Sequence, residues 1–139
     1  MTNIENAKMI LTSGGYSCVL CKDSELFTSS QKGIKPLVDY YKSNCSFNGF
    51  SAADKIVGKA TAFLYLLLGV SAVYADVISS PALELLSKNG VYVGYDTKTD
   101  YIINRQGNGI CPFENAVKDI EDPDTAYGII LDKMKELSI

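Results

Sequence analysis

The chain has 139 residues, of which 47% are hydrophobic and 21% charged, and its formal net charge is −3. This length predicts one globular domain spanning residues 1–139. The acidic balance argues against nucleic-acid binding, which needs a concentrated basic face. The polar start, Met1–Lys8, lacks the pattern of an export signal, and the most apolar stretch, Ala60–Ala75, is shorter than a membrane-spanning helix. We therefore expect a cytoplasmic protein that does not enter the membrane.

Four cysteines and no histidine limit the metal chemistry that the chain can support. In a reducing compartment, disulfides are not expected. The spacing of Cys18 and Cys21 resembles half a zinc knuckle, but no second pair follows it. The segment Tyr16–Cys21 has the pattern of a strand, in which these two thiols would point to opposite faces. The sequence thus predicts neither a metal nor another cofactor.

The first fifty residues predict two helices around a pair of strands. A glycine pair ends the first helix, and a proline begins the second. The first strand is apolar on both faces, which is typical of a central position in a sheet. The expected elements are a helix at Ile4–Leu11, strands at Tyr16–Cys21 and Glu25–Thr28, and a helix from Pro36 to about Ser43.

The segment Ser51–Leu68 predicts one long, buried helix. Ser51 is a good N-cap, and Asp54 stands at the position of a capping box. The residues after Ala60 are nearly all apolar, and a helix that is apolar all round is buried. Gly69 supplies a left-handed stop.

The remaining chain alternates between strands and helices, which indicates a three-layer α-β-α architecture with a mixed central sheet. A proline marks each helix start, and Ser79 or Ser80 is expected to cap the helix that begins at Pro81. The expected elements are strands at Ala72–Ile78 and Val91–Tyr95, an edge strand at Tyr101–Ile103, and helices at Pro81–Lys88, Pro112–Ile120 and from Asp122–Pro123 through Leu137.

Several segments together resemble an uncharacterised prokaryotic family, domain of unknown function 1893, over about Leu11 to Ala126. These segments are GYSCVL at 15–20, KGIKPL at 32–37, GFSAADKIVGKA at 49–60, VYA at 73–75, VIS at 77–79 and INRQGNGICP at 103–112. The resemblance implies a cytidine-deaminase-like fold, which agrees with the element order above. It implies no function, because the family has none established.

Zinc deaminases carry a zinc-binding His and a catalytic Glu at the start of the central helix, and Pro-Cys-x-x-Cys at the next helix start. Here the expected first start reads Ser-Ala-Ala-Asp at 51–54. The second keeps Pro81, but Ala82 and Leu85 stand where the cysteines would be. Without these ligands the chain cannot hold the zinc that activates a hydroxide. We therefore expect the cleft that holds zinc in deaminases to carry other chemistry in this chain.

Charged residues follow the expected start of the central helix. Lys55 and Lys59 are four residues apart and would share one face. Lys59 precedes sixteen residues without a charge, so its amine would be partly desolvated and suited to ligand binding or catalysis. The alternative is that Asp54 only completes the cap and the lysines reach solvent.

A glycine-rich loop precedes the helix expected at Pro112. It contains Asn104, Gly107, Gly109 and Arg105, the only arginine beside twelve lysines. Backbone N–H groups in such a loop, aided by the helix dipole, can bind an anion, and Arg105 could add a bidentate contact. The spacing matches no established phosphate motif. The alternative is a surface turn in which Arg105 pairs with a carboxylate.

Cys111 falls at the N-cap of the same helix. The helix dipole and the nearby Arg105 would stabilise a thiolate there, so Cys111 is a candidate nucleophile. The absence of histidine removes the usual general base, and the alternative is an inert buried cap.

The sequence favours a binding domain whose cleft takes a small anionic, nucleotide-like ligand. The candidate ligand-binding residues are Ser51, Asp54, Lys55, Lys59, Asn104, Arg105, Gly107, Gly109 and Cys111. An enzyme using Cys111 or Lys59, and a structural or regulatory interaction protein, remain the alternatives, and the sequence leaves an oligomer open.

Overall fold

The computed structural model describes residues 1–104 and 106–139, so the predictions for Arg105 lie outside the described residues. Helices and strands alternate over most of this chain. In order they are α1 (Asn3–Gly14), β1 (Cys18–Lys22), β2 (Glu25–Ser29), α2 (Lys35–Lys42), β3 (Ser51–Val57), α3 (Lys59–Leu68), β4 (Ala72–Ser79), α4 (Ser80–Lys88), β5 (Tyr92–Thr99), α5 (Pro112–Val117) and α6 (Pro123–Glu136).

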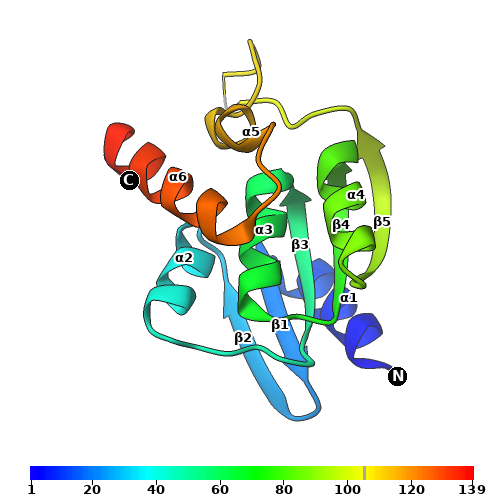
Figure 1. Ribbon diagram of the computed structural model, residues 1–139. Helices are drawn as coiled ribbons and strands as arrows, with labels where there is room; N and C mark the ends of the chain where they lie inside the picture. Colours follow the sequence, from blue (N-terminus) through cyan, green and yellow to red (C-terminus); the bar gives the residue numbers. More distant parts are fainter. Residues whose placement is uncertain (105) are drawn as a thin grey trace.

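The strands form one mixed sheet in the order β2-β1-β3-β4-β5. β1 is antiparallel to β2 and β3, whereas β3, β4 and β5 run parallel. Helix α1 packs on one face, and the helices α2 to α6 lie on the other side (Figure 1). The predicted three-layer α/β architecture with a mixed sheet is therefore confirmed. Because β3 and β4 are parallel, their carboxyl ends and the starts of α3 and α4 lie together at the same end of the strands.

The core lies mainly between the sheet and α3, where eight of the ten residues of α3 are buried. Cys18 and Leu20 of β1 face this side, and Val19 and Cys21 face α1. The predicted opposite orientation of Cys18 and Cys21 is thus confirmed. Gly69 adopts a φ of 86° and ends α3, also as the sequence predicts.

The prediction of one helix over Ser51–Leu68 is wrong in its first half. Residues 51–57 form β3, paired with β1 on one side and with β4 on the other. Gly58, not Ser51, is the N-cap of the helix, which begins at Lys59. Tertiary pairing overrides the local capping pattern here, because Ala52 and Ala53 are fully buried between the two helix layers.

Two boundaries in the second half also differ from the sequence prediction. β5 extends to Thr99, and Ile103 forms only an isolated bridge with Ile110, so β5 is the edge strand instead of Tyr101–Ile103. Helix α5 ends at Val117. Within the described chain, no helix combines the length and apolar character that crossing a membrane requires.

Candidate functional site

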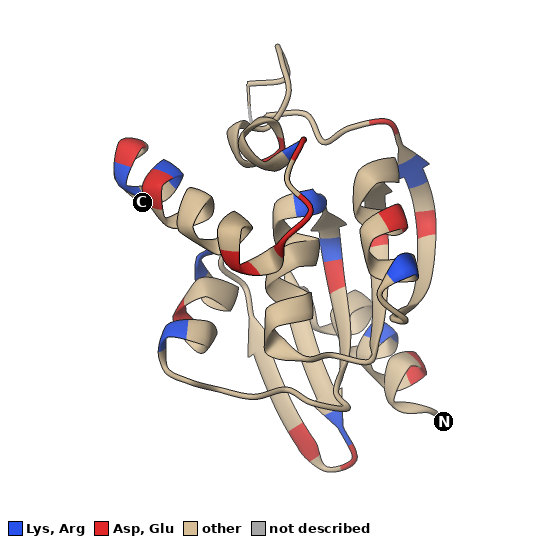
Figure 2. Cartoon of the chain, in the orientation of Figure 1, with Lys and Arg blue, Asp and Glu red and all other residues tan. Residues whose placement is uncertain are grey.

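A cleft of about 340 Å³ opens where the starts of α3 and α4 meet the segment that joins α5 to α6. Its lining mixes lysines with carboxylates: Lys59, Ser80, Pro81, Glu84, Leu85, Lys88, Asp100, Lys118 and Glu121. In Figure 2 the acidic stretch between α5 and α6 passes close to the basic start of α3. The carboxyl ends of parallel strands are the usual place for ligands in α/β folds.

Lys59 is the buried cation of this cleft, with 6% of its surface exposed. It is the first residue of α3, so the position of its backbone is fixed by the central helix. Its Nζ donates a hydrogen bond to the carbonyl oxygen of Lys118 at 2.9 Å and lies 5.7 Å from the centre of the Phe63 ring. Among the described residues, the carboxylate nearest to this Nζ is Glu121, at 3.8 Å.

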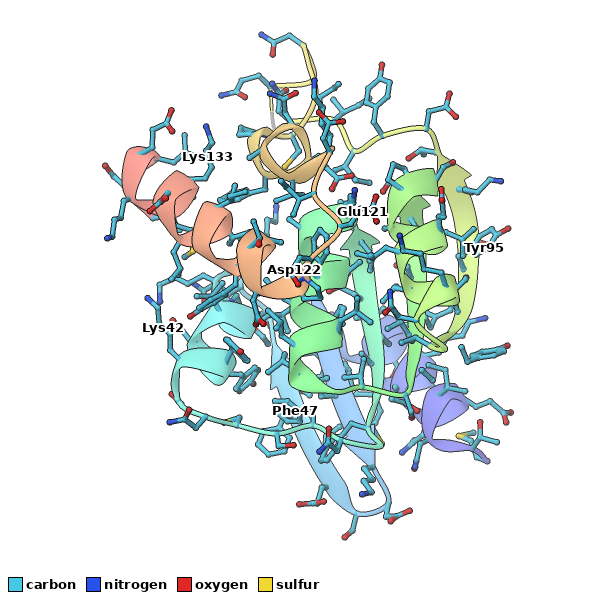
Figure 3. The ribbon with its side chains drawn as sticks, viewed as in Figure 1. Lys42, Phe47, Tyr95, Glu121, Asp122 and Lys133 are labelled. Carbon is cyan, nitrogen blue, oxygen red and sulfur yellow. The ribbon has the colours of Figure 1, made fainter. Side chains whose placement is uncertain are left out.

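Glu121 connects two lysines across the mouth of the cleft. Its carboxylate lies 3.8 Å from Lys59 and accepts a hydrogen bond from Lys88 of α4. The hydrogen bond from Lys88, reinforced by the charge of Lys59, lowers the pKa of Glu121. The Glu121 side chain is 67% exposed, and Figure 3 shows it between the start of α3 and α4. A carboxylate therefore already occupies an oxyanion position between two ammonium groups.

The N-terminus of α3 is closed by Glu114 of α5. Gly58 provides no side-chain cap, and the Glu114 Oε2 accepts hydrogen bonds from the backbone N–H groups of Lys59 and Ala60, the latter at 3.3 Å. Glu114 is 7% exposed. A Cβ at Gly58 would lie 2.6 Å from this carboxylate, so glycine permits the close approach of α5. The N–H groups that would attract an external anion are thus bonded to the chain's own carboxylate.

The start of α4 is also satisfied within the chain. Ser79 caps the helix, since its Oγ accepts a hydrogen bond from the Ala82 N–H at 3.3 Å. The prediction that a serine of this pair caps the helix is therefore confirmed. Ser80 donates to the carbonyl oxygen of Thr99 at 3.2 Å, which connects α4 to the end of β5 at the wall of the cleft.

Asp54 lies on β3 but faces α3, where it belongs to a partly buried polar network. The Tyr65 hydroxyl donates to Asp54 Oδ2 at 2.6 Å, and the Cys18 thiol lies 3.2 Å from the same hydroxyl. Burial, only partly opposed by the Tyr65 hydrogen bond, raises the pKa of Asp54 to about 6. Burial, followed by the nearby Asp54 carboxylate, raises the pKa values of Cys18 and Tyr65. Cys18 and Tyr65 therefore keep their protons at neutral pH, and Asp54 accepts the hydrogen bond from Tyr65.

The structure separates Ser51 and Lys55 from the cleft. Ser51 begins β3, six residues before its end, which corresponds to roughly 20 Å along the strand. Lys55 is exposed and, two residues beyond Ala53, lies on the α1 side of the sheet. The expected helical pairing of Lys55 with Lys59 is therefore wrong, because the two residues belong to different elements.

The loop before α5 is held together by its own polar groups. Asn104 donates to the Asn108 side chain at 2.9 Å and accepts from the Asn108 backbone at 3.2 Å, and its backbone N–H donates to Gly109 at 2.8 Å. Gly107 has a φ of 74°, which glycine adopts readily. In Figure 1 residues 106–110 project from the end of the molecule beyond α5. Neither Asn104 nor the loop glycines line the cleft.

Cys111 is the N-cap residue of α5, as predicted, and is partly buried. Its side chain makes no capping hydrogen bond, and α5 has only six residues. Among the described residues predicted for the site, Lys59 is therefore the one that lines the cleft.

Sequence reasoning missed the partners that build the cleft around Lys59. Glu114, Lys118 and Glu121 are 55 or more residues away in the chain, and only the packing of α5 and α6 on α3 brings them close. One local signal was available. The β-branched pair Ile56-Val57 followed by Gly58 is typical of a strand that ends in a turn, and it would have placed the helix start at Lys59.

The comparisons with known proteins agree with this architecture. A family model described as a domain of unknown function (DUF1893) matches residues 6–134. The chain is also similar to the crystal structure of a DUF1893 family protein (TM1506) from Thermotoga maritima, with 32% sequence identity and a TM-score of 0.87. That similarity covers 94% of this chain and 89% of the other. No curated protein matches the chain. The resemblance seen in the sequence segments is thus confirmed, and the chain belongs to the DUF1893 family.

Proposed function

We propose that the cleft beside Lys59 binds a small anionic ligand, and that Lys59 and Lys88 are its binding cations. The observation that carries this proposal is the burial of the Lys59 ammonium, 6% exposed, at the wall of a cleft of about 340 Å³. Burying a charge is costly unless it is paired and hydrogen-bonded. A volume of this size lies in the range of small-molecule sites.

The ammonium of Lys59 has donors to spare. A lysine carries three N–H donors, and among the described residues one donates to the carbonyl of Lys118. The distance of 3.8 Å to Glu121 is too long for a hydrogen bond. A phosphate or carboxylate oxygen in the cleft would supply the missing acceptor together with a full negative charge.

Glu121 marks the place of this anion. Its exposed carboxylate lies between the two lysines but is not held by burial, so a ligand oxyanion can displace it at small cost. Backbone binding at the start of α3 is not part of the proposal, because Glu114 already occupies those N–H groups.

The opposite wall suggests the chemical class of the ligand. Glu84 and Asp100 are exposed carboxylates that line the same cleft. Carboxylates accept hydrogen bonds from hydroxyl groups. A ligand with an anionic end and a hydroxylated body, such as a sugar phosphate or a nucleotide, fits both walls.

The deaminase-like fold implied by the family resemblance supports the location but not deaminase chemistry. In deaminases the site lies at two helix starts, and here α3 and α4 begin on either side of the cleft. The start of α3 carries Gly58, Lys59 and Ala60, and at the start of α4 Ala82 follows Pro81. We therefore propose a binding site in place of a zinc site.

Isothermal titration with inorganic phosphate, ribose 5-phosphate and nucleoside monophosphates tests the proposal. Lys59→Met should weaken binding of the best of these anions by roughly 10- to 100-fold, the equivalent of one charge-assisted hydrogen bond. Glu121→Gln should strengthen binding, because it removes the competing carboxylate. The matched control is Lys42→Met on α2, an exposed lysine that does not line the cleft. The proposal fails if no anion binds the wild type, or if Lys59→Met and Lys42→Met behave alike.

An enzymatic role for Lys59 is the second candidate, favoured by the same burial of its amine. Turnover of the bound anion, abolished in Lys59→Met but retained in Cys111→Ser, would support this role. Loss of turnover in Cys111→Ser alone would instead assign the chemistry to Cys111.

A further inference from the structure

β5 is an edge strand whose outer side has no partner among the described residues. It spans Tyr92–Thr99 and pairs with β4 on its other side. Its register with β4 keeps a constant offset from Tyr92 to Thr99, without a bulge. Two large aromatic side chains are exposed on it, Tyr92 at 63% and Tyr95 at 43%, and Figure 3 shows Tyr95 at the outer margin of the sheet.

The backbone of β5 presents free hydrogen-bonding groups outward. The Tyr92 N–H donates to the carbonyl of Ser71 at 3.1 Å, so the even-numbered residues of β5 direct their backbone groups toward β4. Alternate residues of a strand direct these groups to opposite sides. Val93, Tyr95 and Thr97 therefore present their N–H and C=O groups to the open edge.

Natural sheets protect such an edge with prolines, bulges, short strands, charged side chains or covering segments. β5 has eight residues, and it contains neither a proline nor a bulge. Its only charged residues, Asp96 and Lys98, are of opposite sign and lie on the same face of the strand. An edge of this kind favours a partner strand whose charges are opposite to those of Asp96 and Lys98.

We propose that β5 pairs antiparallel with β5 of a second copy of the chain, which joins the two sheets across a twofold axis. The argument for a second copy is the charge pattern of the strand, which is complementary to itself in the antiparallel direction. Such a contact is closed, whereas β5 against the opposite edge β2 would propagate into an open fibre.

The charges select the register. Because the outward groups belong to odd-numbered residues, the axis can pass through Thr97, which would pair with its own copy. Asp96 of each chain then lies opposite Lys98 of the other, in the pair type without mutual hydrogen bonds, where side chains approach most closely. An axis through Asp96 would instead place two carboxylates face to face. Tyr95 would pair with Thr99 and lose exposed surface.

Sedimentation equilibrium on the full chain tests both the dimer and its register. Lys98→Asp and Asp96→Lys each place like charges opposite one another, and each should raise the dimer dissociation constant at least tenfold. The double variant that exchanges the two residues should restore wild-type affinity, since the pairs form again with reversed polarity. Thr97→Pro removes an outward N–H without touching the ladder to β4. This variant should sediment as a monomer, and its circular dichroism should show that it remains folded.

A wild-type chain that stays monomeric at high micromolar concentration would overturn the proposal, whether or not a foreign extended peptide binds the edge. So would a dimer that is unchanged by either single charge reversal, or that the exchange variant fails to restore.

Discussion

The ionisation of Asp54 should reduce the stability of the fold at neutral pH. Burial raises the pKa of this carboxyl from 3.8 to about 6, against the Tyr65 hydrogen bond that favours the charged form. One pKa unit corresponds to about 1.4 kcal/mol, so keeping the partly exposed Asp54 ionised in the folded chain costs up to about 3 kcal/mol. This is a large share of the stability of a domain of this size.

The direction of the pH dependence follows from the raised value. Below about pH 4 the carboxyl is protonated in both folded and unfolded chains, and the cost is absent. Between about pH 4 and 6 the unfolded chain ionises while the folded chain keeps its proton, so stability falls. Above the folded pKa of Asp54, about 6, the full cost remains. Other carboxyls with lowered pKa values, Glu121 and Asp122 among them, act in the opposite direction.

Asp54→Asn isolates this contribution, because the amide oxygen can still accept the Tyr65 hydrogen bond but does not titrate. Urea unfolding at several pH values between 4 and 8 should show the variant gaining up to about 3 kcal/mol relative to wild type as the pH rises. The exposed Asp132→Asn controls for the loss of one carboxylate from the net charge. Parallel stability curves for wild type and Asp54→Asn would refute the assignment of a raised pKa to Asp54.

Two further predictions follow from the contacts around α3. Gly58→Ala should destabilise the chain by about 1–3 kcal/mol, because its Cβ would lie 2.6 Å from the Glu114 carboxylate. Most of this loss of stability should vanish in a Glu114→Ala background, as measured by the midpoints of urea unfolding. Equal losses in both backgrounds would contradict the steric explanation. Peptide mass spectrometry of the native chain treated with iodoacetamide should show Cys45 and Cys111 labelled well before Cys18. The Cys18 thiol is buried, and that burial and the Asp54 carboxylate raise its pKa. Early labelling of Cys18 would show that its side of the core opens readily.

The fold was predictable from the sequence wherever a local signal determines the structure. Gly69 stops α3 with a left-handed φ, and Ser79 caps α4, as their residue types indicate. Ser51–Val57 was not predictable in this way. Its serine, alanines and aspartate match a helix start, yet the segment completes the sheet between β1 and β4, where small residues allow both helix layers to pack closely.

The full extent of β5 was also not predictable from the local sequence. Asp96, Thr97 and Lys98 carry no apolar alternation, so the sequence ends the strand at Tyr95. The strand continues because parallel pairing with β4 continues to Thr99, and an edge strand can expose polar side chains on both faces.

The candidate site was predictable only at Lys59, because its desolvation follows from the apolar run that succeeds it. The role of Glu114 could not be read in the same way. Its position near the start of α5 suggests a local helix cap, and it instead closes the start of α3, 55 residues away in the chain.

Asp54 and Lys59 are ionisable side chains near the junction of β3 and α3, where burial makes a charge costly. An asparagine could accept the Tyr65 hydrogen bond, and a methionine could fill much of the volume of Lys59, so folding alone gives little reason for either charge. Proteins tolerate such costs mainly where function requires them. Asn104 and Asn108 differ in this respect, because their side chains are bonded to each other. Asp54 does not line the cleft, and its negative charge would repel an anion. Asp54→Asn should therefore be more stable at neutral pH and bind the anion no less well than the wild type, and weaker binding by this variant would contradict an anionic ligand.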